Sequence, residues 1–327
     1  MSLNRFDRAY EGLNHLLGSQ NPTTLNALSL IAVFYANIGH SKKAESMFRE
    51  ILAGQKFSLG NLHPDTLWTQ NCLGGVLFMK EKSEESVRLV ENALEDLQSV
   101  PGPEHLDTLW VAHNLAQIYV NISKIKEAVA LQEKVVEGYV KELGDDHINT
   151  LYMINDLGDC YMREERFGKA HEMFEKAFEG KKRKFGLRSP HTLYTATFLA
   201  ITMKELGSEK EAEDLYKATL ETAIEILGPE HADVCLCSMY LADLYVGQRR
   251  FLEARELYQK VYAIRLRLQG PDHKNARHVE QILLEINKRI DFPDHVASQA
   301  PMKSRQGLDT PSQMGFRGRG DTVQVLF

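Results

Sequence analysis

The sequence is poor in cysteine and has no long apolar run. Four cysteines occur among 327 residues, and no two of them show the C-x-x-C spacing of a redox or zinc motif. Cys72, Cys160 and Cys237 fall inside helical patterns, where cysteine is usually a small buried apolar residue. No apolar stretch approaches the roughly 20 residues that a membrane span needs. These features predict a cytoplasmic protein in a reducing compartment.

An excess of positive charge is also missing. The chain has 39 Lys and Arg against 45 Asp and Glu, and its net charge of −6 predicts no general attraction to nucleic acid or to an anionic membrane. Residues 1–13 lack a signal-peptide pattern, because charged residues interrupt any apolar core. The sequence holds no pattern that indicates an oligomeric state.

The short motifs of catalysis are absent as well. No G-x-S-x-G, H-E-x-x-H or protein-kinase signature occurs. The many carboxylates lie beside Lys and Arg on what we expect to be solvated helix faces with i,i+4 partners. We therefore expect no enzyme, no cofactor and no metal centre.

The sequence does contain a repeat with a fixed period. The phrase LGDDHINTL at 143–151 returns, with changes, at 17–25, 59–67, 101–109, 185–193, 227–235 and 269–277. Its glycine steps by 42 residues each time: Gly18, Gly60, Gly102, Gly144, Gly186, Gly228 and Gly270. A period of 20–50 residues is typical of a solenoid, in which each repeat is one supersecondary unit stacked on the next.

Each unit carries two amphipathic helical patterns, such as 107–122 and 124–143 in the third unit. Proline at the first helical position marks several helix starts, with Asn21 and Ser189 as expected N-caps in two cases. The periodic glycine suits a left-handed C-cap. Because the connections are short, consecutive helices should be antiparallel neighbours.

Small residues recur where the two helices of a unit must approach each other. On the first helix they are Ala32, Gly74, Ala116, Gly158, Ala200 and Ala242, and on the second Ala44, Ser86, Ala128, Ala170, Ala212 and Ala254. A large residue follows the first row three positions later, and an aromatic residue follows the second row four positions later in most units. This pattern is typical of the tetratricopeptide repeat (TPR), stretched here from 34 to 42 residues by a longer second helix.

The L-G-x-x-H-P-D-T-L phrase on this period resembles the kinesin-light-chain type of TPR, and it is similar to the TPR arrays of fungal and bacterial NLR-like proteins. The resemblance covers roughly residues 3–290. It implies a scaffold or adaptor that binds a partner protein; a sensor array of an NLR-like signalling protein and a cargo adaptor like kinesin light chain are the alternatives. The heptad segment of kinesin light chains and the phosphate loop of NLR-like proteins do not occur in this sequence, so we expect that they were lost or that this is one piece of a longer protein.

The expected fold is an all-α, right-handed TPR superhelix of six helix pairs with one more helix at each end, over residues 3–290. The units lie near 19–60, 61–102, 103–144, 145–186, 187–228 and 229–270. Residues 291–327 are dominated by Pro, Gly, Ser, Gln and Asp, and we predict a disordered tail there.

Five histidines share one position of the repeat, namely His63, His105, His147, His231 and His273. A metal site needs three or four ligands around one ion. Equivalent positions in a stacked array are separated by at least one helix-packing distance, roughly 8–10 Å. We therefore expect these histidines to pack or cap at helix starts rather than to bind a metal.

The candidate site is the concave groove that the first helices line in TPR superhelices. The residue directly after the periodic leucine is aromatic in four repeats. The residues three and seven positions further along the same helix are mostly polar. The candidate groove residues are Trp68, Trp110, Tyr152 and Tyr194, then Asn71, His113, Asn155 and Thr197, then Gln117, Asp159 and Asp243. Rings offer large apolar contacts, and amides can bond the backbone of an extended protein or peptide partner. The alternative is that the rings pack between neighbouring first helices as core.

Overall fold

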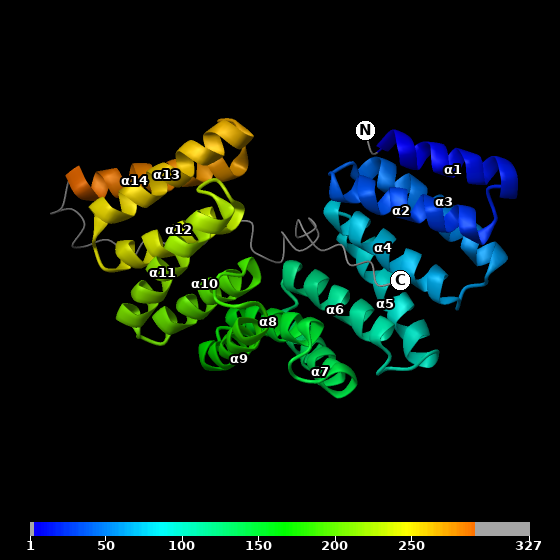
Figure 1. The fold of residues 1–327 in the computed structure, drawn as a ribbon, viewed down its shortest axis with the longest axis horizontal. Helices are drawn as coiled ribbons and strands as arrows, with labels where there is room; N and C mark the ends of the chain where they lie inside the picture. Colours follow the sequence, from blue (N-terminus) through cyan, green and yellow to red (C-terminus); the bar gives the residue numbers. More distant parts are fainter. Residues whose placement is uncertain (1–2, 292–327) are drawn as a thin grey trace. The chain divides into compact units, whose positions relative to one another are not determined.

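The computed structural model describes residues 3–291, with side chains from residue 8 onward, and its helices follow the 42-residue period (Figure 1). The first helices of the repeats are α2 (Pro22–Asn37), α4 (Pro64–Met79), α6 (Leu106–Asn121), α8 (Ile148–Arg163), α10 (Pro190–Glu205) and α12 (Ala232–Gly247). The second helices are α3 (Ser41–Ser58), α5 (Ser83–Ser99), α7 (Ile125–Leu143), α9 (Phe167–Phe185), α11 (Glu209–Leu227) and α13 (Phe251–Gln269). With α1 (Leu3–Leu17) before the first pair and α14 (Lys274–Asp291) after the last, the predicted all-α solenoid of six helix pairs and two terminal helices is confirmed.

The described chain divides into two compact units. Unit 1 ends at Asp145 and holds α1–α7, and unit 2 begins at Asp146 and holds α8–α14. Within each unit, helices that follow one another in the chain pack side by side, as α4 and α5 do in unit 1 and α10 and α11 in unit 2 (Figure 1). Asp291 still belongs to α14, and the rest of the predicted tail, 292–327, lies outside the described residues.

The periodic histidines cap four first helices and the terminal helix α14. Nδ1 of His63 accepts a hydrogen bond from the backbone N–H of Asp65 at 3.2 Å, and the same bond recurs at His105, His147, His231 and His273. Asn21 caps α2 in the same way, through the N–H of Thr23. The capping interpretation is therefore confirmed for these residues. It is wrong for Ser189, whose side chain makes no capping bond at the start of α10.

The small residues of the two predicted rows lie at the contact between the first and second helix of each pair. All ten alanines and serines named there have no exposed surface, and Ser86 Oγ also donates to the carbonyl of Gly74 across the contact at 2.7 Å. A third set of small residues was not predicted. Gly180 on α9 faces the periodic leucine Leu151, and a Cβ at Gly180 would lie 2.4 Å from Leu151 Cδ2. Gly138 meets Leu109 in the same way in unit 1.

A left-handed residue follows each first helix, and the sequence analysis predicted none of these six. They occur every 42 residues, at Gly39, Glu81, Ser123, Glu165, Gly207 and Arg249. The residue after each one donates its N–H back into the helix, as Arg166 does to the carbonyl of Tyr161 at 2.9 Å, which is the six-to-one bond of a Schellman motif. Four of the six positions hold a residue with a Cβ, so no glycine marks these turns in the sequence.

The contact between Gly180 and Leu151 is tested by an alanine at two positions of α9. We expect Gly180→Ala to lower the free energy of unfolding by about 1–3 kcal/mol, because the buried Leu151 has to move against packed neighbours. The control, Gly168→Ala, adds a methyl group where nothing lies within 4 Å and should raise stability by about 0.5 kcal/mol. Urea titration followed by circular dichroism measures both, and equal effects of the two alanines would contradict the close approach.

The left-handed turns allow a reciprocal test in unit 2. Glu165 (φ 60°) and Gly207 (φ 92°) occupy the same position of successive repeats. We expect Glu165→Gly to raise the free energy of unfolding by about 0.5–1 kcal/mol. The glycine removes backbone strain from the folded state, and this gain exceeds the cost of the extra conformational entropy that glycine gives the unfolded chain. Gly207→Glu should destabilise by a similar amount, since no atom lies near its added Cβ and backbone strain is then the main cost. Effects of the same sign at both positions would show that strain is not what distinguishes them.

Candidate peptide-binding surface

The two tryptophans of the candidate row are exposed in unit 1. Trp68 on α4 is 42% exposed, and Trp110 on α6 is 37% exposed. These two helices are neighbouring first helices, and the side chain of Asn114 on α6 donates to Asn71 Oδ1 on α4 at 3.3 Å. Because the tryptophans occupy the same position of adjacent repeats, they lie on one face of unit 1.

The polar row beside the tryptophans is buried. Asn71 accepts the hydrogen bond from Asn114, and His113 Nδ1 lies 3.1 Å from Gln132 Oε1 on α7. The ring of Trp110 packs against the ring of His113 at 5.6 Å between centroids. Gln117, in the third row, is half-buried. The structure therefore places Asn71 and His113 beneath the surface, where they hold helices together.

The tyrosines of the candidate row, in unit 2, are half-buried and engaged with neighbouring side chains. The Tyr152 hydroxyl lies 3.0 Å from His191 Nδ1, and the Lys181 amine lies 4.8 Å from the Tyr152 ring centroid. The Tyr194 ring packs 4.9 Å from the Phe198 ring. The same position of the repeat thus carries exposed indoles in unit 1 and packed phenols in unit 2.

A buried lysine was not predicted, although it lies directly below Tyr152. Lys181 on α9 is 1% exposed and donates to Thr195 Oγ1 at 2.8 Å and to Asn155 Oδ1 at 3.4 Å. Thr195 also donates to Asn155 at 2.9 Å, so Asn155 belongs to a polar network inside the core. The burial of Lys181 could have been predicted from the sequence, because the equivalent positions of other repeats hold the apolar Leu97 and the aromatic Tyr139. Both are buried.

The remaining candidate residues are also bonded within unit 2. Thr197 is buried and donates to the carbonyl of Leu193 on its own helix. Asp243 is buried and accepts the hydroxyl of Tyr258. Burial raises the pKa of Asp159, although Arg163 lies 3.0 Å away and favours the charged form.

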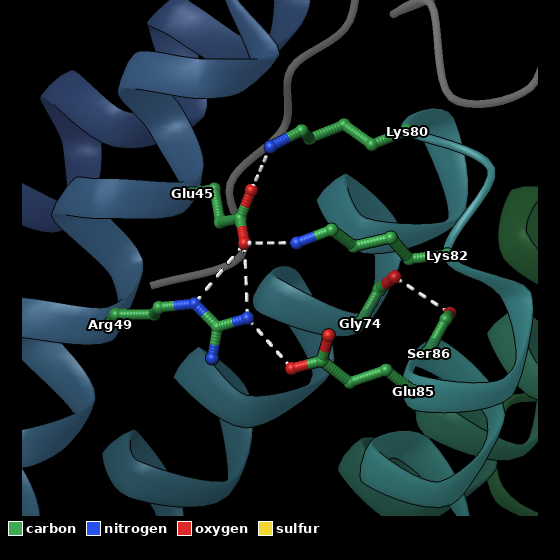
Figure 2. Close-up of polar contacts among 7 residues, drawn as sticks. All are labelled: Glu45, Arg49, Gly74, Lys80, Lys82, Glu85 and Ser86. Atoms are coloured by element: carbon green, nitrogen blue, oxygen red, sulfur yellow. Dashed lines mark hydrogen bonds and ion pairs between the residues drawn. The ribbon is translucent and has the colours of Figure 1, made fainter.

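Figure 2 shows a cluster of charges that joins successive repeats of unit 1. Glu45 on α3 accepts hydrogen bonds from Arg49 one turn along, and from Lys80 and Lys82 in the turn after α4. Arg49 also donates to Glu85 on α5 at 2.7 Å. The hydrogen bond from Lys80 is the largest cause that holds the pKa of Glu45 at about 2.

The same cluster recurs four repeats further on, in unit 2. Glu213 accepts from Lys217 at 2.6 Å and from Arg250 at 2.7 Å, and Arg250 also donates to Glu253. Burial opposes the ionisation of Glu213, but the hydrogen bonds from Arg250 and Lys217 outweigh it and hold the pKa at about 2. The expectation of i,i+4 pairs on solvated faces was therefore incomplete, since these carboxylates also bind cations 37 residues away.

Two further observations describe what residues 3–291 contain. Among them no group of three His, Cys, Asp or Glu side chains is placed to hold a metal ion. None of their helices combines the length and the apolar character required to cross a membrane.

The chain belongs to the tetratricopeptide-repeat family, whose sequence profile matches residues 65–139, 123–183 and 191–267. The comparison with curated proteins found no match. Similar solved structures include a Podosopora anserina protein assigned to the kinesin light chains, with nearly identical TPR-like repeats. It is 26% identical, with a TM-score of 0.55 over 63% of this chain and 98% of that chain. The predicted likeness to kinesin-light-chain-type repeats is thus confirmed.

Two more distant structures share the fold. BtubC (BKLC) from P. vanneervenii is 20% identical, with a TM-score of 0.61 over 69% of this chain and 91% of that chain. A Signal Transduction ATPase with Numerous Domains (STAND) from Pyrococcus horikoshii, which has a TPR sensor, is 14% identical, with a TM-score of 0.64. That match covers 86% of this chain and 41% of the STAND protein.

The two charge clusters predict an acid-dependent loss of stability. The pKa values of Glu45 and Glu213 fall from 4.5 to about 2 on folding, so their contribution is complete above pH 4.5 and is lost as the pH falls towards about 2. After allowance for solvent screening we expect about 1–2 kcal/mol from each. Urea titrations at neutral and acid pH should show a smaller loss in the Glu45→Gln/Glu213→Gln variant than in the wild type. Glu172→Gln, at an exposed position of α9, is the control, and an equal loss in all three proteins would contradict the assignment.

Proposed function

We propose that this protein is a non-enzymatic interaction module of the cytoplasm, and that unit 1 binds a segment of a partner protein over Trp68 and Trp110. The observation that supports the proposal is the exposure of these two rings on adjacent first helices. Tryptophan is mostly buried in folded proteins and is enriched among the residues that dominate binding energy at interfaces. Covering the exposed part of each ring would contribute about 2 kcal/mol from apolar area alone.

The burial of the polar row sharpens this proposal. Asn71 and His113 are bonded within unit 1, so their role in binding is to fix the helices that carry the tryptophans. Gln117, two turns along α6 from Trp110, is half-buried. A partner would therefore contact mainly rings, with few polar groups to satisfy.

Two finer roles use the same surface. A cargo adaptor is supported by the likeness to a protein assigned to the kinesin light chains. A sensor array is supported by fold alone, since the STAND protein is 14% identical. A phosphate loop encoded upstream of residue 1 would favour the sensor, and a heptad segment there would favour the adaptor.

The test is a selection of peptides from a random display library on the whole protein. Peptides selected on the wild type are then titrated against Trp68→Ala/Trp110→Ala, with Phe57→Ala as the matched control. Phe57 is an aromatic residue of unit 1 that is 87% exposed on a second helix. We expect the double variant to lose at least about tenfold in affinity, or about 1.4 kcal/mol, and the control to lose nothing. Trp68→Phe/Trp110→Phe should restore part of the binding.

Circular dichroism must show equal helix content in the wild type and each variant. Affinities that do not depend on the two tryptophans, or a selection that yields no binding peptide, would refute the proposal.

A further inference from the structure

Charge is nearly absent from the first helices of unit 1. The fully described helix α2 has no charged residue, and α4 and α6 have one each, Asp65 and Asp107. Both carboxylates lie in the first turn, beside the capping histidines His63 and His105. The rest of these helices offers a neutral surface, which we define by Leu30, Trp68, Trp110, Asn114 and Gln117.

The first helices of unit 2 differ in this respect. They carry charged side chains beyond the first turn, including Asp159 with Arg163 on α8 and Lys204 with Glu205 on α10. The neutral surface is therefore a property of unit 1 and not of the repeat.

The lack of charge limits what can cover the tryptophans. Asp65 and Asp107 stand three residues before Trp68 and Trp110, so they offer a counter-charge to a basic side chain. An acidic side chain pressed against the tryptophans would lose hydration and gain no counter-charge from α2, α4 or α6, at a cost of several kcal/mol. We infer that the segment bound by unit 1, given the proposed function above, has no acidic side chain and carries two large apolar side chains three residues apart in an extended, polyproline II conformation.

The spacing of the two side chains follows from the repeat. Neighbouring packed helices lie about 8–10 Å apart, and Trp68 and Trp110 occupy the same position on α4 and α6. In polyproline II, residues i and i+3 lie on one face about 9 Å apart, because the helix rises 3.1 Å per residue with three residues per turn. A β-strand places same-face side chains about 7 Å or about 13 Å apart, which fits the two rings less well.

The backbone of such a segment also suits this surface. A polyproline II chain has no internal hydrogen bonds and few donors where proline is frequent. Its carbonyls need donors, and the half-buried Gln117, two turns along α6 from Trp110, has a side-chain amide that can donate.

The probes are four synthetic peptides with blocked ends in a background of proline, serine and glutamine. The first has two leucines at i and i+3, and the second has the same composition with the leucines at i and i+2. The third and fourth keep the i and i+3 spacing but replace two glutamines by glutamate or by lysine. Both tryptophans of the chain lie on the neutral surface, so intrinsic fluorescence of the whole protein reports on this site alone.

We expect the first peptide to bind at least about tenfold more tightly than the second peptide and the glutamate peptide, and its affinity to stay constant between ~50 mM and ~500 mM salt. The lysine peptide should bind at least as tightly as the first, because Asp65 and Asp107 lie beside the tryptophans. A matched variant, Gln117→Lys, places a cation on the neutral surface. It should raise the affinity of the glutamate peptide and make that affinity fall with salt.

The outcomes separate the two proposals. Equal or tighter binding of the glutamate peptide, weaker binding of the lysine peptide than of the first, or salt-dependent binding of the first peptide overturns the inferred charge preference and leaves the proposed function intact. Equal binding at the i and i+2 spacing overturns the polyproline II geometry. A fluorescence unchanged by all four peptides overturns the inference as a whole, while the display selection with the tryptophan variants decides the proposed function independently.

Discussion

The close approach of the first and second helix in each repeat is the constraint on which the rest of the structure depends. It occurs at small, buried residues, such as Gly74 on α4 and Ser86 on α5, where Ser86 Oγ donates to the carbonyl of Gly74. A larger side chain at either position would separate the two backbones and open the core of the repeat. Because each repeat touches mainly its neighbours, the stability of a solenoid is a sum of such local contacts.

This contact also fixes the register of every other feature. Every first helix is 16 residues long and begins 42 residues after the one before it, so a given slot faces the same way throughout a unit. The register puts Trp68 and Trp110 on one face, the capping histidines at one end of the helices and the left-handed turns at the other. A surface for a partner can then change by single substitutions, since the scaffold beneath it stays the same.

Most of the fold could be predicted from the sequence because its determinants repeat. Six occurrences of a helix cap or a small residue distinguish a pattern from chance, and the structure confirms nearly all of them. The exceptions are informative. Glu165 adopts a left-handed conformation at a position where no glycine would indicate it. Ser189 has a side chain suited to an N-cap but makes no capping hydrogen bond.

The candidate surface could be predicted less well, because whether an amide is exposed or buried depends on a partner from another helix. Asn71 is buried because Asn114 donates to it, and Asn155 because Lys181 does. Neither partner is close in sequence, and neither pair repeats in every unit. The sequence left two alternatives for the tryptophans, since two large rings at one position of adjacent repeats are either core or surface. Their exposure in the structure favours the surface.

Because of the charge clusters, the repeats differ in whether they can be duplicated or deleted without breaking an ion pair. Glu45 meets a lysine of the following repeat, Lys82, and the same position three repeats later holds Ser208. A deletion in frame with the period that set Glu45 against Ser208 would keep every helix and every cap, yet it would leave the carboxylate without that cation. Val87 occupies the position of Glu45 in the next repeat, and its apolar side chain needs no cation from a neighbouring repeat. We therefore expect deletions between repeats to cost an ion pair at some junctions of this array and none at others.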